Sequence, residues 1–199
     1  MTKRSRGRPR ADSESVSPAK ILSEALALLD SEGFESLTMR AVALRAGVNP
    51  MTIYHHFQDR DGLIRALADT VYADVAPPSG GAVRSRIEGL LRAYRSKVVR
   101  HPGLTLAIFN RPAVFPQHAR RITDTLANLL GDLGLSPSQA LLWVHILVDY
   151  THGAALAVAM DGTSGGALQA GIDPDYGNYE RAVSELLDRL DQLCVCDGL

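Results

Sequence analysis

The stretch that decides the fold is LTMRAVALRAGVNPMTIYHHF, residues 37–57. Thr38 and Asn49 each stand where a side-chain oxygen can accept a hydrogen bond from the first free amides of a helix. Pro50 follows Asn49 at the first helical position, where the missing N–H of proline costs nothing. Gly47 lies between the two caps, and a glycine with positive φ commonly ends a helix. The stretch therefore predicts two short helices, over 38–46 and 50–57, joined by a tight turn.

Helical patterning continues on both sides of this stretch. Apolar residues recur every three or four positions, and no segment alternates convincingly with period two. Caps, prolines and glycines divide the pattern into further helices, expected at about 17–32, 59–75, 83–100, 103–109, 116–132, 136–160 and 178–195. We expect an all-α protein with a flexible basic arm over 1–16, a group of short helices over 17–63 and a longer helical part over 64–199.

Two short helices joined by a tight turn can place the second helix in the major groove of DNA, N-terminus first. Side chains near its start can hydrogen-bond base edges or phosphates, or contact a thymine methyl group. The candidates are Asn49, Pro50, Met51, Thr52, Tyr54, His55 and His56. The alternative is an ordinary helical hairpin inside a core, which the spacing alone does not exclude.

The residues at these positions resemble the DNA-binding domain of the tetracycline-repressor (TetR) family. The runs 37–43, 46–48, 52–57 and 59–63 carry the resemblance, which covers about residues 17–67. It implies a three-helix helix-turn-helix DNA-binding domain over 17–63 and a C-terminal ligand-binding and dimerisation domain over 64–199. The protein would then be a homodimeric repressor that binds palindromic double-stranded operator DNA and releases it when a small molecule binds the C-terminal domain. It also implies that Thr38, Arg40 and Arg60 contact the DNA backbone. Gly62 departs from the family pattern, in which a helix former is common, and this glycine would loosen the hinge between the domains.

Charge is divided unevenly along the chain. The formal net charge of −1, read as an average, argues against nucleic acid. The first ten residues, however, carry five basic side chains and no acidic one, so the remainder is net acidic. Arg6 and Arg8 belong to an Arg-Gly-Arg-Pro run that resembles the core of an AT-hook, which lies in a narrow minor groove. The alternative is a solvated basic tail that adds only non-specific attraction, and either arrangement strengthens DNA binding.

The expected helix 136–160 carries a polar line on an apolar background. His145, Asp149 and His152 fall at i, i+4 and i+7, with Trp143 nearby. They could form a ligand-pocket wall, share a metal ion or lie at a subunit interface, and the spacing leaves all three open. Resemblance to the tetracycline-repressor type of C-terminal domain places Leu104, Phe109, Asn110, Arg111 and His118 near a cavity. The residues that hold magnesium–tetracycline find no convincing match, so we expect an unidentified small-molecule effector and no metal or cofactor.

Two of the expected helices are candidates for the dimer interface. Helix 136–160 and helix 178–195 are both rich in apolar residues, and two such helices from each subunit would form a four-helix bundle. The apolar stripe of the later helix is too strong for a helix that faces only solvent. The residues that we expect at the interface are Leu147, Val148, Val183, Leu186, Leu187 and Leu190.

Composition disfavours several function classes. Two cysteines near the C-terminus favour a reducing, cytoplasmic location over a disulfide-rich secreted one. The most apolar stretch, 140–160, is interrupted by charged and polar residues, so we expect a core or interface helix and no membrane span. No nucleophile elbow, phosphate loop or dense cluster of metal ligands suggests an enzyme. The leading hypothesis is a ligand-responsive repressor, and the alternative is a ligand-independent DNA-binding regulator controlled by a protein partner.

Overall fold

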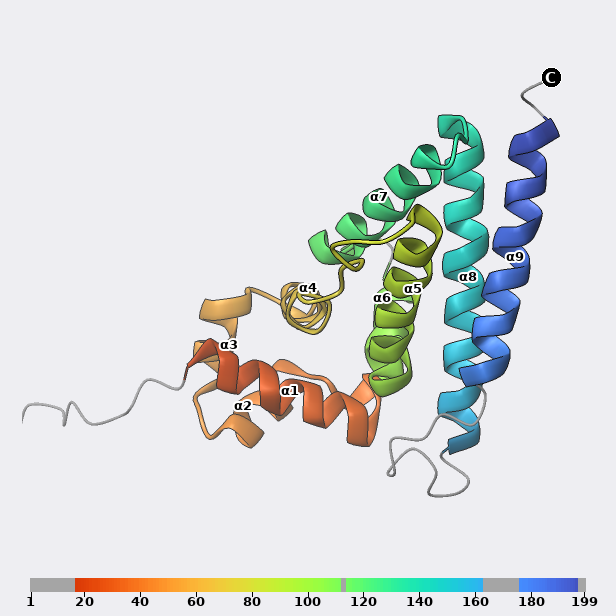
Figure 1. Cartoon of the computed structure of the whole chain (residues 1–199). Coiled ribbons are helices and arrows are strands. Elements are labelled where there is room, and N and C mark those ends of the chain that lie inside the picture. Colours follow the sequence, from red (N-terminus) through yellow and green to blue (C-terminus); the bar gives the residue numbers. More distant parts are fainter. Residues whose placement is uncertain (1–16, 112–113, 163–175, 197–199) are drawn as a thin grey trace, which may run out of the picture.

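The computed structural model describes residues 17–111, 114–162 and 176–196. Within these ranges every regular element is a helix, which confirms the expected all-α class (Figure 1). The N-terminal elements are α1 (Pro18–Glu32), the 3-10 turn η1 (Phe34–Ser36), α2 (Met39–Ala46) and α3 (Pro50–Phe57). They lie together at one end of the molecule in Figure 1. The basic arm over 1–16, with Arg6 and Arg8, lies outside the described residues.

The predicted caps form at the starts of these helices. The Ser17 hydroxyl accepts from the Lys20 amide at 3.3 Å, and the Thr38 hydroxyl accepts from the Ala41 amide at 3.1 Å. Asn49 Oδ1 accepts from the Met51 amide at 2.9 Å. Gly47 closes α2 in the left-handed conformation, with φ 69° and ψ 32°. Each cap involves residues at most four apart, which is why the sequence locates these boundaries correctly.

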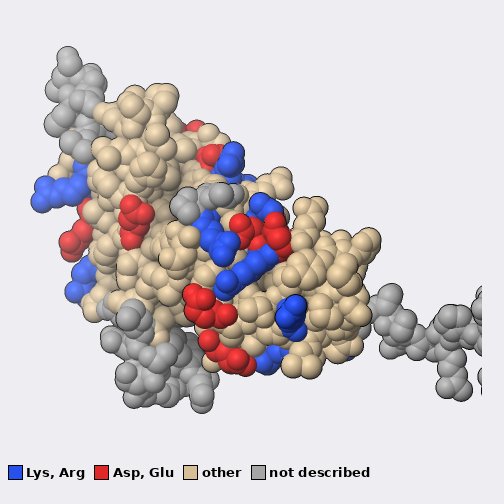
Figure 2. Space-filling view, turned by 180° about the vertical axis from the view of Figure 1, so that it is seen from behind, with Lys and Arg blue, Asp and Glu red and all other residues tan. Residues whose placement is uncertain are grey.

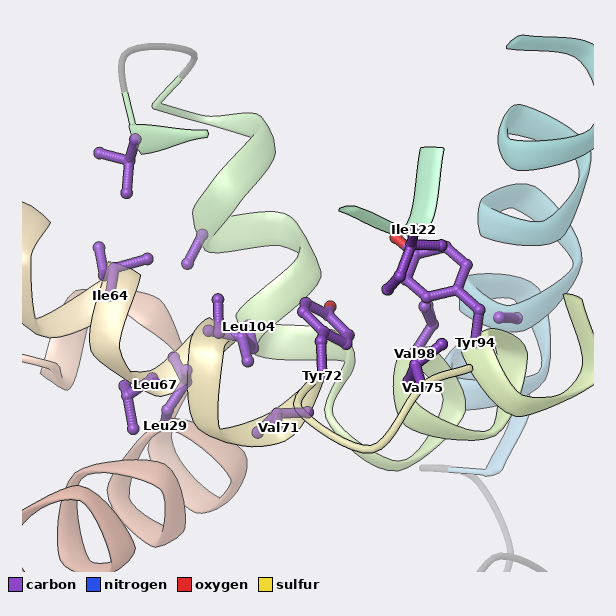
Figure 3. Packing of buried hydrophobic residues seen from close by; sticks show 14 of the residues in the cluster. Leu29, Ile64, Leu67, Val71, Tyr72, Val75, Tyr94, Val98, Leu104 and Ile122 are labelled. Atoms are coloured by element: carbon purple, nitrogen blue, oxygen red, sulfur yellow. The ribbon is translucent and has the colours of Figure 1, made fainter. Parts of the chain in front are cut away.

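Helix α4 (Arg60–Val71) lies at the centre of the molecule and contributes to the core on both sides (Figures 1 and 3). Its residues Ile64 and Leu67 are buried in the same cluster as Leu29 of α1. Beyond its end, Tyr72 and Val75 are buried in that cluster with residues of the C-terminal helices. One continuous core therefore joins the DNA-binding part to the rest of the chain.

Helix α4 ends at Val71, four residues before the end expected from sequence. The guanidinium group of Arg121 donates to the carbonyls of Tyr72, Ala73 and Val75 at 2.9–3.2 Å. It thereby satisfies carbonyl groups that another helical turn would have paired internally. A residue distant in sequence sets this boundary, so the local pattern could not locate it.

The C-terminal part consists of α5 (Val83–Arg100), α6 (Pro102–Phe109), α7 (Gln117–Asp132), α8 (Pro137–Gly162) and α9 (Tyr176–Cys196). Helices α8 and α9 run side by side along one flank, and α5 and α7 pack against α8 (Figure 1). The segment Pro137–Ala159 is long and apolar enough to cross a membrane, and 33% of it is buried within the subunit. Core helices of soluble proteins pass the same test, so this is weak evidence for a span.

Most of the residues expected at a dimer interface lie inside their own subunit. Leu147, Val183, Leu187 and Leu190 are buried in the core, while Leu186 is partly buried against it. Val148 lines an internal cavity. The α9 stripe faces α5 and α8 of the same chain, and this packing already accounts for its apolar character. The large apolar side chains that α8 exposes are instead Leu141 (55%), Leu142 (57%) and Ile146 (36%).

Candidate functional site

Helix α3 has one buried face and one exposed face. Ile53 and Phe57, at i and i+4, are buried in the N-terminal core. On the opposite face Met51 is 70% exposed and Tyr54 is 43% exposed. His55 and His56 are also exposed, whereas Pro50 and Thr52 are half-buried. A two-turn helix with large side chains projecting into solvent has the form needed to enter a DNA groove.

The first amides of α3 are already paired in the absence of DNA. The Met51 amide donates to Asn49 Oδ1, and the Thr52 amide donates to the Asn49 carbonyl at 2.9 Å. A phosphate bound at this helix N-terminus would have to displace the Asn49 cap. The side-chain amide of Asn49 keeps its N–H donors, which can reach a base edge or a phosphate without that exchange.

Cationic side chains near α3 fall into two groups. Arg45 is engaged by Glu24 at 3.1 Å and by Glu32 at 3.8 Å. Arg40 is exposed on α2, and in the described part of the chain no carboxylate pairs with it. Figure 2 shows basic and acidic side chains interspersed near the middle of this face, so neither charge forms a separate patch there. Arg40 is therefore available for a phosphate contact and Arg45 is held by protein.

Arg60 is engaged within the protein. Its guanidinium group donates to the Phe34 carbonyl and lies 3.9 Å from the centre of the Phe34 ring. Burial, together with the neighbouring Arg111, lowers the pKa of Arg60 from its ordinary value. Arg111, in the segment after α6, pairs with Asp61 and lies 5.7 Å from the same ring. We refer to Phe34, Arg60, Asp61 and Arg111 as the clamp.

The clamp changes the interpretation of Arg60. The resemblance implied a DNA-backbone contact, but the structure uses this side chain to join η1 to the start of α4. The partners of Arg60 and Arg111 come from segments that are distant in sequence. Only the folded chain could show that the two cations converge on one aromatic ring.

A cavity of about 330 Å³ lies between the end of α4 and helices α5 to α8. Figure 3 shows Tyr72, Tyr94 and Ile122, which belong to its wall. Phe109 and Phe115 are both about half exposed, so they form its opening to solvent. The described lining is mostly apolar and aromatic, and consists of Tyr72, Tyr94, Thr105, Ile108, Phe109, Phe115, Ala119, Ile122, Thr123, Val148 and His152. Volume and lining are both typical of a small-molecule site.

Two hydrogen-bonded pairs supply much of the polarity of the wall. Tyr94 Oη lies 2.6 Å from His152 Nε2, and Tyr72 Oη lies 3.3 Å from Thr105 Oγ1. Burial raises the pKa of both tyrosines, so both keep their hydroxyl protons at neutral pH. Burial lowers the pKa of His152, so its imidazole is neutral. The Nδ1 atom of His152 is buried and has no hydrogen-bond partner.

Only two of the residues expected to bind ligand line this cavity, namely Phe109 and His152. The Phe109 ring covers the His152 imidazole at 4.7 Å between centroids, whereas His145 and Asp149 on the same helix are exposed. Helical spacing places three side chains on one broad face, but only part of that face is covered by a neighbouring helix. The polar line is therefore divided between cavity and solvent.

The other expected ligand residues are engaged elsewhere. Leu104 is buried in the core, and the Asn110 side chain donates to the Leu106 carbonyl. His118 pairs with Asp69 of α4 at 3.0 Å, and Arg111 belongs to the clamp. Trp143 is half-buried and lies outside the cavity wall. Among the described residues no group of three or more His, Cys, Asp or Glu side chains could hold a metal ion.

Sequence reasoning missed Tyr72, Tyr94 and Thr105. Each is buried within an apolar helical pattern, where a tyrosine or threonine is easily taken for ordinary core. The available signal was that a buried hydroxyl needs a partner, which neither local sequence segment supplies.

A helix-turn-helix unit with an exposed second helix, joined through one core to a larger helical part, is the architecture of a DNA-binding transcriptional regulator. The comparisons with known proteins support a regulator of the TetR family. Residues 21–67 match the family model described as "Bacterial regulatory proteins, tetR family". This confirms the resemblance carried by residues 37–63.

Curated relatives support the same family. The chain is 37% identical to an uncharacterised HTH-type transcriptional regulator, Rv0681, of Mycobacterium tuberculosis, over 53% of this chain and 55% of that protein. It is 26% identical to the HTH-type transcriptional repressor DrrR1 of Streptomyces coeruleorubidus, over 68% of this chain and 51% of that protein. The chain thus spans about half the length of these relatives. Both are transcriptional regulators and not enzymes, as the sequence predicted for this chain.

Solved structures share the fold. BioQ of Mycobacterium smegmatis superposes with a TM-score of 0.74 at 24% identity, covering 87% of this chain and 97% of BioQ. A separate structure, of a BioQ with its double-stranded DNA operator, gives a TM-score of 0.66 at 22% identity, covering 87% of this chain and 97% of that chain. A TetR variant from Acinetobacter baumannii AYE in complex with minocycline gives 0.69 at 21% identity, covering 89% and 98%. At these identities the similarity establishes the fold.

Proposed function

We propose that this protein is a homodimeric transcriptional repressor that binds a palindromic operator through α3 and releases it when a small molecule enters the cavity. The observation that carries the proposal is the two-faced α3, with Ile53 and Phe57 buried and Met51 and Tyr54 exposed. The structure of a fold relative, BioQ, with its DNA operator supports the same use of the fold. We expect a protein that binds operator DNA to work in the cytoplasm, where the bacterial chromosome lies.

Dimer formation has a candidate surface on α8. Leu141, Leu142 and Ile146 form an exposed apolar face near the start of this helix. We infer that a second copy of the chain covers this face, because a palindromic operator presents two half-sites related by a twofold axis. The interface then differs in its residues from the one expected from sequence, although it uses one of the same helices.

Communication between cavity and DNA-binding helices has a physical route through α4. The C-terminal part holds α4 at three places: Arg111 pairs with Asp61 near its start, His118 with Asp69, and Arg121 with the carbonyls beyond its end. Phe109 lines the cavity two residues before Arg111. A ligand that displaces Phe109 would therefore also shift Arg111 and its contacts in the clamp. The shift changes DNA binding only when the ligand binds one arrangement of α4 more tightly than the other.

The direct test is selection of bound duplexes from a library of random 30-base-pair DNA with the full-length protein. We expect a palindromic consensus whose half-sites lie about one helical turn apart. Thr52→Ala and Tyr54→Ala should each weaken binding to the selected duplex by about 1–3 kcal/mol. Thr125→Ala on α7 is the matched control and should bind normally.

Two results would revise this proposal. Selection of no consensus, or full binding by both α3 variants, would contradict DNA recognition by α3. A selected operator that no small molecule releases would favour the ligand-independent regulator, in which a protein partner controls binding.

A further inference from the structure

The cavity wall favours uncharged ligands. No charged side chain is among the described residues that line it, and the nearby cation Arg120 lies outside, 5.7 Å from the ring of Phe115 at the opening. A charged ligand would give up its hydration inside the cavity without gaining an opposite charge, which is costly. Four aromatic rings, of Tyr72, Tyr94, Phe109 and Phe115, offer flat apolar surface instead.

The Tyr94–His152 pair determines where one hydrogen-bond donor lies. The Tyr94 hydroxyl keeps its proton, and its only hydrogen-bond partner in the described structure is His152 Nε2 at 2.6 Å. If Tyr94 donates to Nε2, the single proton of the neutral imidazole sits on Nδ1. The reverse arrangement would leave the Tyr94 proton with no acceptor. The buried, unpartnered Nδ1 of His152 is therefore an N–H donor.

The second pair leaves another donor in the same wall. Tyr72 and Thr105 share one hydrogen bond of 3.3 Å between two hydroxyl groups, so one of the two protons is not used in it. The rings of Tyr72 and Tyr94 lie 5.5 Å apart, which places both pairs on one side of the cavity. The wall thus presents donors that lack acceptors.

Nδ1 of His152 is itself shielded from the cavity, and the Phe109 ring lies against this imidazole. We propose that the cavity takes an uncharged aromatic molecule that displaces the Phe109 ring and whose carbonyl oxygen accepts a hydrogen bond from His152 Nδ1. The volume of about 330 Å³ is at the small end for ligand sites and suits a molecule of two or three fused rings. The aromatic side chains of the wall stack on the rings of the ligand, and the ligand carbonyl accepts the hydrogen bond that His152 Nδ1 otherwise lacks. The proposal rests on the proposed function only for its regulatory consequence, since binding itself is measured without DNA.

The test is calorimetric titration of the full-length protein with four matched probes. They are 2-acetylnaphthalene, its isopropenyl analogue in which CH₂ replaces the carbonyl oxygen, the 2-naphthoate anion and the cation 1-(2-naphthyl)ethylammonium. The ketone should bind about tenfold more tightly than the isopropenyl analogue, the factor expected for one hydrogen bond to a buried donor. It should also bind more tightly than either ion. The carbonyl stretching frequency of the bound ketone should lie below that of the same ketone dissolved in an alkane, where no donor is present.

Two variants distinguish the hydrogen bond from His152 from general packing in the cavity. His152→Phe keeps an aromatic ring in the wall and should abolish the advantage of the ketone over the isopropenyl analogue. His145→Phe, an exposed histidine seven residues earlier on α8, should leave it unchanged. If His152→Phe fails to fold, the infrared shift in the unaltered protein still decides whether the carbonyl is hydrogen-bonded.

Each outcome has a distinct meaning. Equal binding of ketone and isopropenyl analogue, tighter binding of an ion, no binding of the ketone or an unshifted carbonyl band would each overturn the proposed ligand class. Release of operator DNA by charged compounds, with no ketone binding, would overturn it while leaving the proposed function intact. Ketone binding that leaves DNA bound would support the ligand class and contradict ligand-induced release.

Discussion

At the scale of single residues, Gly62 shows how a close backbone approach constrains the turn between α3 and α4. A Cβ atom at this position would lie 2.0 Å from the Phe57 carbonyl oxygen. The Gly62 amide donates to Asp59 Oδ1 at 2.7 Å, which caps α4. Gln58, within the same turn, has a positive φ of 66°. Gly62 is therefore needed for a tight junction, and the expectation of a looser hinge, based on its low helix propensity, is not supported by this geometry.

We expect Gly62→Ala to lower the free energy of unfolding by about 1–3 kcal/mol, the usual cost of forcing an atom into occupied space. Gly131→Ala is the matched control: it is also a helical glycine, but a Cβ there meets nothing within 4 Å. That control should be neutral or stabilising by up to about 1 kcal/mol through helix propensity. Urea denaturation of both variants measures the difference, and equal stabilities would contradict the proposed clash.

His152 should make stability depend on pH. Burial lowers the pKa of its imidazole, so the folded state takes up a proton less readily than the unfolded state, whose pKa is about 6.5. The free energy of unfolding therefore falls as the pH decreases below about 6.5 toward the native pKa. We expect His152→Gln to lose less stability than the unaltered protein between about pH 7 and 5. Parallel stability profiles would show that His152 does not titrate differently on folding.

At the scale of elements, α8 and α9 differ in what covers them, although the sequence made both candidates for the dimer interface. The stronger apolar stripe belongs to α9, yet Val183, Leu187 and Leu190 are buried within the subunit. The exposed apolar face lies on α8, at Leu142 and Ile146. A stripe indicates that a helix is covered, but it does not indicate whether its own chain or a second copy covers it.

This difference predicts opposite effects of two double variants. Leu142→Asp with Ile146→Asp should give folded monomers, because both side chains project from the subunit. Leu187→Asp with Leu190→Asp should instead unfold the protein, because each buries a carboxylate in the core. Sedimentation velocity and circular dichroism distinguish the results. A dimer that survives the first pair of changes would place the interface elsewhere.

At the scale of the whole molecule, the clamp joins the two functional parts of the chain. Arg111 reaches Asp61 from the segment that follows the cavity-lining Phe109. Arg111→Ala should increase amide hydrogen exchange over η1 and the first turn of α4. Arg92→Ala, which breaks an ion pair with Glu180 between α5 and α9, is the control and should leave that region unchanged. Unaltered exchange at the start of α4 in Arg111→Ala would show that the clamp does not link the cavity to the DNA-binding helices.

The basic arm belongs to the same scale, because its charge contrasts with a net acidic remainder. Deletion of residues 2–10 should weaken binding to the selected operator and flatten the dependence of affinity on salt. The slope of log affinity against log salt concentration should change by about 0.9 for each phosphate that the arm neutralises in the intact protein. Titrations at several salt concentrations measure the slope. An unchanged slope would show that the arm binds no phosphates.

The sequence by itself determined the helical class, most helix starts in the N-terminal half and the position of α3. Caps such as Thr38 and Asn49 act over three residues or fewer, so a short segment contains all the information they need. Because the local pattern covers only a few residues, it could not predict where α4 ends or which residues line the cavity. These depend on Arg121, Tyr94 and other residues from distant segments.

The tertiary structure decided which side of each apolar helix is covered and where the charged side chains go. It buried Leu187 and exposed Leu142, placed Arg60 against Phe34 and joined Tyr94 to His152. The physical reason is that burial and pairing depend on which neighbouring element arrives, and hydrophobic attraction has no direction of its own. Local sequence specifies that a surface will be covered, and packing selects its partner.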